Sequence, residues 1–448
     1  MEKEKNFINE REIATNIIMD INRDNVFNNI AIKNALSNHD LTSGQRNTVT
    51  EIVNGVLRNK IYLEYCINKI SKTNTTKMKP FILALLLCGV YEIFFMSAKN
   101  AFVCNEAVNL AKKKGYKNLA PFVNGVLRNI IRAYEKGEFE IEMGKDKLQS
   151  LSLKYSYPKW LVGYWNKYYG DNVQYICSFL NTPPKVSIAI NNKKVTRVAL
   201  KSKLTFADIE VVNGEVSKNS LLLKNTRDLR ENDSFKKGEF WVMDESSQRA
   251  MEYIDFSKFN KNFKVLDLCA APGGKSFFIK SIVDEEVHIT SCDIYEHKLE
   301  LLEDGFKRLG FSNYDIVLND ATKRNESFVN NFDCVLVDAP CSGFGLLRKK
   351  PDIKYSKEYE DILDLQKLQL NILTASKDYV KDNGVIVYST CTISPLENEM
   401  VIEEFLKENK SFEKEYMETI LPMDKQIDKG FECDGFFVAI LRKVSENG

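Results

Sequence analysis

The chain has 448 residues, a length typical of two or three domains. Its content of 44% hydrophobic and 28% charged residues is ordinary for a globular protein. The net charge of +1 conceals an asymmetry, since residues 1–240 carry 37 Lys and Arg against 24 Asp and Glu, whereas residues 241–448 carry 26 against 38. The basic first part predicts a polyanionic partner, with uneven solvated charge as the alternative, and the acidic second part is not expected to provide the main electrostatic contact.

Several classes of protein are disfavoured by the same counts. None of the ten cysteines pair as CxxC, so a zinc ribbon is not expected, and three histidines offer little for a mechanism built on several histidines. The first ten residues lack the apolar core of a signal peptide, and the longest apolar run, Phe81–Phe95, is too short for a bilayer and contains Glu92. We therefore expect a cytoplasmic protein with reduced thiols, no membrane contact and no metal.

Residues 1–140 are predicted to form an all-helical domain. Thr42 and Gln45 have the spacing of a capping box that opens a helix. The segment VNGVLRN occurs twice, at 53–59 and 123–129, which predicts two similar helices in one bundle. In both copies the Val and Leu side chains are expected to pack inward, with Arg58 and Arg128 facing outward.

Residues 141–235 change character and are predicted to form a small α/β connector. Val186–Ile190 has the composition of a strand, and Lys193, Lys194 and Arg197 follow it. Basic residues interleaved with aromatics fit contact with nucleic acid, but a plain connecting domain fits as well.

From residue 236 to 448 strands alternate with helices, which predicts a doubly wound α/β domain. Ligands bind beyond the carboxyl ends of the strands in such domains. The predicted strands are Lys264–Leu268, His288–Cys292, Asp315–Val317, Cys334–Val337, Val385–Tyr388 and Phe436–Leu441.

The stretch VLDLCAAPGGKS at Val265–Ser276 predicts a buried strand, a glycine turn and the start of a helix at Lys275. This arrangement suits an anionic or nucleotide-like ligand. A P-loop would need glycine five positions before Gly274, where the chain has Cys269, and a GxGxxG pattern is absent. A nucleoside triphosphatase and a dinucleotide enzyme are therefore disfavoured.

Two acidic residues follow the next strands. Asp293 ends the second strand, a position suited to ribose hydroxyls, and Asp320 follows the third, where it could accept a hydrogen bond from an adenine amino group. Each alone is more often a turn or cap residue. Together with Asp267 at the end of the first strand, they converge on one crevice and favour an adenosine ligand.

Two cysteines follow the fourth and fifth strands. Cys341 lies in DAPCSG at 338–343, and Cys391 lies just past Val385–Tyr388. A single cysteine at such a place is usually a packing residue, but two that face one crevice favour reactive thiols. The thiolate is the nucleophilic form, so the site must lower one pKa.

The motifs AAPGGK, DAPCSG and YSTCT with the later ENE resemble those of the RNA cytosine-C5 methyltransferases that use S-adenosylmethionine. The paired VNGVLR segments and the Leu86–Tyr91 stretch are similar to the NusB-like RNA-binding domain. The combination resembles family members that methylate 16S rRNA. It implies an α+β multidomain fold: a NusB-like bundle (1–140), the small α/β connector (141–235) and a Rossmann-like class I methyltransferase domain (236–448).

The resemblance also implies roles. The turn would surround the methionine end of S-adenosylmethionine, with Cys269, Ala270, Ala271, Pro272, Gly273, Gly274 and Lys275 in contact. Asp293 would bind the ribose, Asp320 would lie by the adenine, and Asp338 would lie near the methyl donor and the target base. Cys391 corresponds to the family nucleophile and Cys341 to the cysteine that helps release the product. The partner would be a single-stranded or flipped-out cytosine of 16S rRNA, bound by a monomer.

One departure and two alternatives remain. The family usually carries Arg where this chain has Ala189, so one RNA contact would be lost or taken by Lys193 or Lys194. A related methyltransferase acting on 23S rRNA or tRNA is one alternative. An RNA-binding or antitermination protein with a vestigial methyltransferase domain is the other, and the intact Cys341 and Cys391 argue against it.

Overall fold

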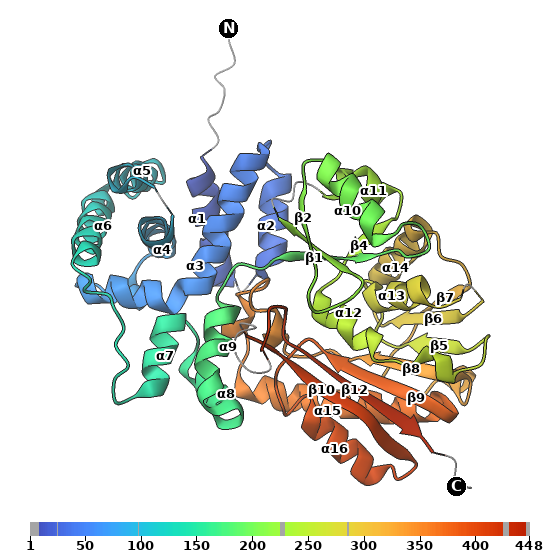
Figure 1. Ribbon diagram of the computed structural model, residues 1–448. Coiled ribbons are helices and arrows are strands. Elements are labelled where there is room, and N and C mark those ends of the chain that lie inside the picture. Colours follow the sequence, from blue (N-terminus) through green and yellow to red (C-terminus); the bar gives the residue numbers. More distant parts are fainter. Residues whose placement is uncertain are drawn as a thin grey trace. The chain divides into compact units, whose positions relative to one another are not determined.

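The computed structural model describes residues 9–24, 26–96, 98–224, 229–284, 286–423 and 430–444. The chain forms two compact units (Figure 1). Unit 1 comprises Met1–Asn181 and Leu347–Ser356, and unit 2 comprises Thr182–Leu346 and Lys357–Gly448. The division after Asn181 falls inside the stretch expected as a connector. Among the described residues, no helix is both long enough and apolar enough to cross a membrane.

The described part of unit 1 is helical, as predicted for the first part of the chain. Its longest helix begins after Thr42, whose hydroxyl accepts the Gln45 N–H while the Gln45 side chain accepts the Thr42 N–H, so the capping box is confirmed. The α-helices are α1 (Glu10–Asp24), α2 (Asn28–Ser37), α3 (Ser43–Ile70), α4 (Pro80–Phe95), α5 (Asn100–Lys113), α6 (Ala120–Glu135), α7 (Lys147–Tyr155), α8 (Lys159–Tyr169) and α9 (Val173–Leu180).

The two VNGVLRN copies lie on α3 and α6, and their Val and Leu side chains are buried in one core. The prediction for the arginines is half wrong. Arg128 is exposed, but Arg58 is buried, and its guanidinium reaches the backbone oxygen of Arg348 at 3.5 Å. Contact with a segment 290 residues away therefore breaks the symmetry of the repeat.

That distant segment, Leu347–Ser356, is here called the strap. It belongs to unit 1 although it follows the fourth strand of the large sheet in sequence. Lys354, which is only 1% exposed, donates to the Arg58 carbonyl at 2.7 Å, and the Tyr355 hydroxyl donates to the Leu57 carbonyl at 2.8 Å. These bonds use carbonyls of α3 and satisfy buried polar groups of the strap.

Unit 2 begins with a small antiparallel sheet in the order β2-β3-β1-β4. β1 coincides with the predicted strand. The elements of this small module are β1 (Val186–Ile190), α10 (Arg197–Phe206), β2 (Glu210–Asn213), β3 (Ser220–Lys224), α11 (Asp233–Lys236) and β4 (Phe240–Val242).

The rest of unit 2 is built on an eight-stranded sheet in the order β11-β10-β12-β9-β8-β5-β6-β7. Strands β5 to β9 pair in parallel, whereas β12 runs antiparallel to β9 and β10. The strands are β5 (Lys264–Asp267), β6 (His288–Asp293), β7 (Tyr314–Leu318), β8 (Phe332–Asp338), β9 (Val380–Thr390), β10 (Phe412–Pro422), β11 (Gly430–Phe431) and β12 (Phe436–Lys443). This sheet confirms the predicted doubly wound domain.

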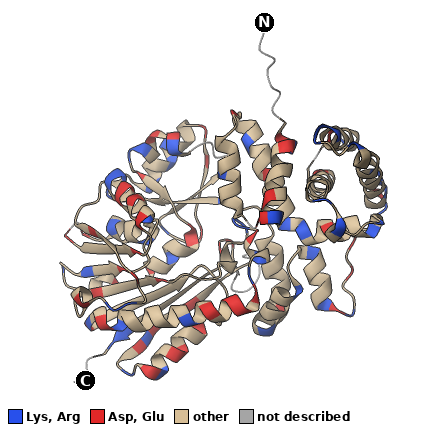
Figure 2. Ribbon diagram, turned by 180° about the vertical axis from the view of Figure 1, so that it is seen from behind, with Lys and Arg blue, Asp and Glu red and all other residues tan. Residues whose placement is uncertain are grey.

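Helices cover both faces of the large sheet (Figure 1). Phe278 and Phe306 bring two helices onto one face, and Leu373 and Phe405 bring two others onto the opposite face, each pair within its own apolar core. The helices are α12 (Glu245–Glu252), α13 (Gly274–Ile282) and α14 (Glu296–Leu309) on the first side, and α15 (Tyr359–Ser376) and α16 (Glu399–Glu408) on the second. Acidic residues gather along α15 and α16 (Figure 2).

Candidate active site

The carboxyl ends of three neighbouring strands form the centre of the site. Asp267 ends β5, Asp338 ends β8, and Cys391 directly follows β9. β8 pairs in parallel with both β5 and β9. The strand order reverses between β5 and β8, and this is the position at which open α/β sheets bind ligands.

The glycine turn after β5 requires its glycine. Gly273 has φ of +107°, in the left-handed region, and a Cβ built there would lie 2.2 Å from the Phe277 ring. The Gly273 N–H donates to the Ala270 carbonyl at 2.7 Å, and the Ala270 N–H donates to the Cys292 carbonyl at 2.7 Å. The turn is thereby tied to β6, and α13 begins directly at its end.

A cavity of about 180 Å³ lies against this turn. It brings together residues that the sequence singled out from two separate motifs: Cys269, Ala270, Ala271, Pro272, Gly274, Lys275 and Asp338. Asp267, expected at the crevice from its place at the end of the first strand, also lines it. The sequence did not point to three further lining residues around the start of α12, Met243, Asp244 and Ser247. Gly273 shapes the turn without lining the cavity.

Asp267 is an unusual lining residue because it is fully buried and only half satisfied. Its Oδ2 accepts a hydrogen bond from the Ser276 hydroxyl at 2.7 Å, but its Oδ1 has no partner among the residues that the structure describes. Burial raises the pKa of Asp267 to about 7, although the Ser276 hydrogen bond acts in the opposite direction. A buried carboxylate oxygen without a donor calls for a polar ligand in the cavity.

Asp338 is held by two side chains. Its Oδ2 lies 2.6 Å from the Lys275 ammonium, and its Oδ1 accepts a hydrogen bond from the Ser389 hydroxyl at 2.9 Å. The Lys275 side chain is only 11% exposed and lies over the Phe436 ring. The ion pair joins the glycine turn to the end of β8 and fixes the direction of the Asp338 carboxylate.

The two cysteines meet, as expected from their places at the ends of adjacent strands. The Cys341 and Cys391 sulfurs are 3.2 Å apart, and both residues are half-buried. The hydrogen bond to Cys391, together with burial, raises the pKa of Cys341 well above its ordinary value. Cys341 is therefore a protonated thiol at neutral pH that can donate a hydrogen bond to the Cys391 sulfur.

A buried carboxylate supports the loop that carries Cys341. Glu397 accepts hydrogen bonds from the Ser342 N–H at 2.7 Å and the Ser342 hydroxyl at 2.6 Å. Gln369 donates to Glu397 at 3.2 Å and to the Pro340 carbonyl at 2.9 Å. Burial raises the pKa of Glu397. In the sequence, Glu397 was noticed only as the first residue of the ENE motif, and no role was predicted for it.

A second set of bonds fixes the turn that carries Cys391. Asn398 accepts the Thr390 hydroxyl at 2.6 Å and donates to the Thr392 carbonyl at 3.0 Å, so it closes the turn on both sides of Cys391. The Gly345 N–H donates to the Cys391 carbonyl at 3.0 Å. The turns that carry Cys341 and Cys391 are therefore both held by hydrogen bonds from neighbouring residues.

Asp293 and Asp320 lie at the carboxyl ends of the next two strands but do not line the cavity of about 180 Å³. The Asp293 carboxylate accepts the Tyr295 N–H at 3.1 Å. Asp320 accepts the Thr322 hydroxyl at 2.6 Å, and hydrogen bonds from Thr322 and Lys323 lower the pKa of Asp320. Both carboxylates thus have local turn partners, and their roles toward a ribose and an adenine stay predictions.

Among the described residues, no group of three or more His, Cys, Asp and Glu side chains is arranged to hold a metal ion.

Comparison with known families divides the chain into three matched stretches. A family model described as 16S rRNA methyltransferase RsmB/F matches residues 257–442, and the NusB family model matches residues 8–132. A ferredoxin-like domain of RsmF/B-like methyltransferases matches residues 157–230.

Individual proteins resemble the chain over nearly its whole length. The probable ribosomal RNA small subunit methyltransferase B of Bacillus subtilis is 35% identical, with 97% of this chain and 98% of that protein covered. The crystal structure of PH0851 superposes with a TM-score of 0.77 at 24% identity, over 97% of this chain and 99% of that one. A methyltransferase homologue from Pyrococcus horikoshii gives a TM-score of 0.56 at 24% identity, over 67% of this chain and all of that one.

Proposed function

Because the chain belongs to the RsmB/F family of 16S rRNA methyltransferases, we propose that it methylates C5 of a cytosine in 16S rRNA through a covalent bond between Cys391 and C6 of the base. The observation that carries the covalent step is the pair of cysteine sulfurs 3.2 Å apart at the carboxyl end of the parallel sheet. One thiol is held protonated beside the other, which suits a nucleophile with its own hydrogen-bond donor.

The family cofactor, S-adenosylmethionine, fits the residues of the cavity. Three carboxylates, those of Asp244, Asp267 and Asp338, line it with a single cation, Lys275. This excess of negative charge complements a ligand that carries both an ammonium and a sulfonium. The Oδ1 atom of Asp267, which has no partner among the described residues, offers a hydrogen-bond acceptor for the ammonium. We assign the carboxylate end of the cofactor to Lys275 and the start of α13, the ribose to Asp293 and the adenine to Asp320.

The proposed chemistry explains the need for two thiols. Bound S-adenosylmethionine would supply a methyl group on a positively charged sulfur, which would keep the electron pair of the broken carbon–sulfur bond and leave as a neutral thioether. C5 of cytosine is a weak nucleophile, so the Cys391 thiolate adds to C6 and the electron pair of the C5–C6 double bond becomes available at C5. After C5 has taken the methyl group, loss of the C5 proton re-forms the double bond as the bond between C6 and Cys391 breaks.

We assign the remaining roles from the contacts of each group. Asp338, whose carboxylate is held by Lys275 and Ser389, hydrogen-bonds the edge of the base. Cys341 assists release of the product, a role supported by its contact with the Cys391 sulfur. The half-buried Cys391 cannot be reached by a stacked base, so we propose that the cytosine is presented single-stranded or flipped out. The protein is proposed to act as a monomer, which sedimentation analysis tests.

The test compares single cysteine variants on 16S rRNA that lacks the modification. Cys391→Ala should reduce methyl transfer on the order of a thousandfold or more. Cys341→Ala should accumulate a protein–RNA adduct, seen as a shifted band on a denaturing gel. Cys104→Ala, in α5 of unit 1, is the matched control and should retain activity. Undiminished transfer by Cys391→Ala contradicts the proposal.

The RNA itself distinguishes related activities. Bisulfite sequencing of total RNA from cells with and without the protein should show one cytosine of 16S rRNA that loses its 5-methyl group. A lost site in 23S rRNA or tRNA instead would reassign the substrate, and no lost site together with no calorimetric binding of S-adenosylmethionine would indicate a domain without catalytic function.

A further inference from the structure

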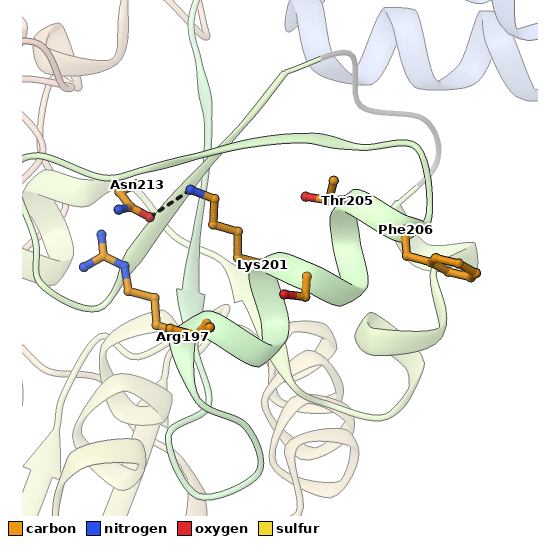
Figure 3. A pocket seen from close by; sticks show the side chains of 7 residues that line it. Arg197, Lys201, Thr205, Phe206 and Asn213 are labelled. Atoms are coloured by element: carbon orange, nitrogen blue, oxygen red, sulfur yellow. Dashed lines mark hydrogen bonds between the residues drawn. The ribbon is translucent and has the colours of Figure 1, made fainter.

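A second hollow lies on the small module of unit 2, between α10 and β2 (Figure 3). Its volume is about 620 Å³, and it shares no lining residue with the cavity at the glycine turn. The lining residues with polar or aromatic side chains are Arg197, Lys201, Ser202, Thr205, Phe206 and Asn213. The lining holds two cations and no carboxylate, so the hollow has the charge of an anion-binding surface.

The two cations are fixed in place without being neutralised. The Arg197 guanidinium donates to the backbone oxygens of Lys218 at 3.2 Å and Gly214 at 3.3 Å. The Lys201 ammonium reaches the amide oxygen of Asn213 at 3.5 Å, as Figure 3 shows. In the part of the chain that the structure describes, neither cation forms an ion pair with a carboxylate.

Other lysines of the same module behave differently. Lys203 pairs with Glu239, Lys224 with Glu210 at 2.8 Å, and Lys236 with Glu231 at 2.8 Å. Lys201 and Arg197 thus have no carboxylate partner among the described residues, whereas these three lysines do. Because residues four apart on a helix share a face, α10 presents Arg197, Lys201 and Thr205 in one row.

An exposed aromatic side chain completes the hollow. Phe206, the last residue of α10, is 94% exposed, and Val198 near the other end of the helix is 76% exposed. A solvent-facing Phe beside unpaired cations is the combination by which proteins hold single-stranded nucleic acid, since the cations contact the phosphate backbone and the ring stacks on a base of any sequence. The hydroxyls of Ser202 and Thr205 add donors for phosphate or sugar oxygens.

We propose that this hollow binds a single-stranded segment of the RNA substrate, with Arg197 and Lys201 on phosphates and Phe206 stacked on a base. The inference rests on the proposed RNA methylation for the identity of the strand, but it concerns binding and not the chemical step. The inference also gives a role to Arg197, one of the three basic residues that follow β1. The other two, Lys193 and Lys194, do not line the hollow.

The test measures binding separately from methyl transfer. The affinity of the full-length protein for a fluorescent single-stranded 16S rRNA fragment is measured by anisotropy at several salt concentrations. Lys201→Gln should weaken binding and make the negative slope of log K against log salt shallower by about 0.7, as expected for one lost phosphate contact on a single strand. Phe206→Ala should weaken binding on the order of tenfold with the slope unchanged. Lys201→Arg should restore binding, which distinguishes a lost contact from a misfolded variant.

Lys236→Gln is the matched control, because it removes one positive charge from the same module at a lysine that is already paired with Glu231. In methyl-transfer assays, Lys201→Gln and Phe206→Ala should raise the KM for RNA at unchanged kcat. If both variants match the control in affinity and salt slope, the hollow is not an RNA site. If the wild type binds RNA through these residues but transfers no methyl group, the proposed function fails and this inference stands.

Discussion

Asp267 shows how far a single residue can be understood from sequence. Its position at the end of the first predicted strand pointed to the crevice, but its complete burial and its unpaired Oδ1 depend on Ser276 and on the packing of the sheet around β5. The convergence of Cys341 and Cys391 was predictable, because both follow strands that are adjacent in a parallel sheet. The hydrogen bonds by which Glu397 and Asn398 hold the turns of the two cysteines could not be predicted, because hydrogen-bond geometry leaves no periodic signal in a sequence.

The raised pKa of Asp267 predicts a pH-dependent stability. The folded protein favours the protonated carboxyl up to a pKa of about 7, whereas the unfolded chain ionises near 4. The stability that this preference contributes is present below pH 4 and is lost as the pH rises through about 7. The thermal midpoint of the wild type should therefore fall relative to that of Asp267→Asn between pH 5 and pH 8. Parallel midpoint curves would show that the group is ionised in the folded state throughout this range.

Glu397 predicts a defect in a specific step. Glu397→Gln replaces an oxygen that accepts from Ser342 with an amide that donates, so the loop carrying Cys341 loses part of its support. The variant should accumulate the protein–RNA adduct, as Cys341→Ala should, while still transferring the first methyl group. A denaturing gel and a single-turnover assay check this. Normal release with slower transfer would assign Glu397 to another step.

At the scale of elements, patterning recovered the parallel strands and β12 but missed β10 and the short strands of the small sheet, although β3 is buried. The apolar runs at β5, β6, β8, β9 and β12 are strands in the structure. β10, with the sequence FEKEYMETILP, carries charges at 413, 414, 415 and 418 and is only partly buried, so its pairing with β12 decides its conformation. β2, β3 and β4 were missed for a related reason, because short antiparallel strands depend on partners elsewhere in the chain.

The start of α13 predicts a contrast between two adjacent glycines. Gly273→Ala places a Cβ into the Phe277 ring at a left-handed backbone position, which should cost about 1 to 3 kcal/mol and lower the thermal midpoint. Gly274→Ala meets nothing closer than Met243 at 3.9 Å and should leave the midpoint nearly unchanged. Differential scanning calorimetry of the protein without cofactor compares them. Equal losses would show that the turn relaxes around either methyl group.

At the scale of the whole molecule, the sequence predicted a helical part followed by an α/β part, and both exist. The strap, however, lies within the second part of the sequence, and no motif in it points to the helical part. Its membership of unit 1 rests on contacts such as that between Lys354 and Arg58, which are 296 positions apart in the chain. Single-sequence patterning works within windows of about 11 to 18 residues, so it cannot detect such a contact.

The strap predicts that the second part of the chain is incomplete alone. Residues 182–448 expressed without 1–181 lose the carbonyls of α3 that Lys354 and Tyr355 use, and leave a normally buried segment in water. This fragment should aggregate or be cleaved rapidly by protease within 347–356, and co-expression of residues 1–181 as a separate chain should restore soluble protein. A soluble, protease-resistant fragment 182–448 would contradict the prediction.

The strap also constrains how such a gene can change. A protein whose parts are joined by one linker can exchange either part by a single recombination event. Here ten codons in the second half of the reading frame, for residues 347–356, encode part of the helical unit. A crossover at codon 181 would therefore combine a foreign helical bundle with a strap that is adapted to pack on a different bundle. The helical unit and this internal stretch must be inherited together or adapt to one another by later substitutions.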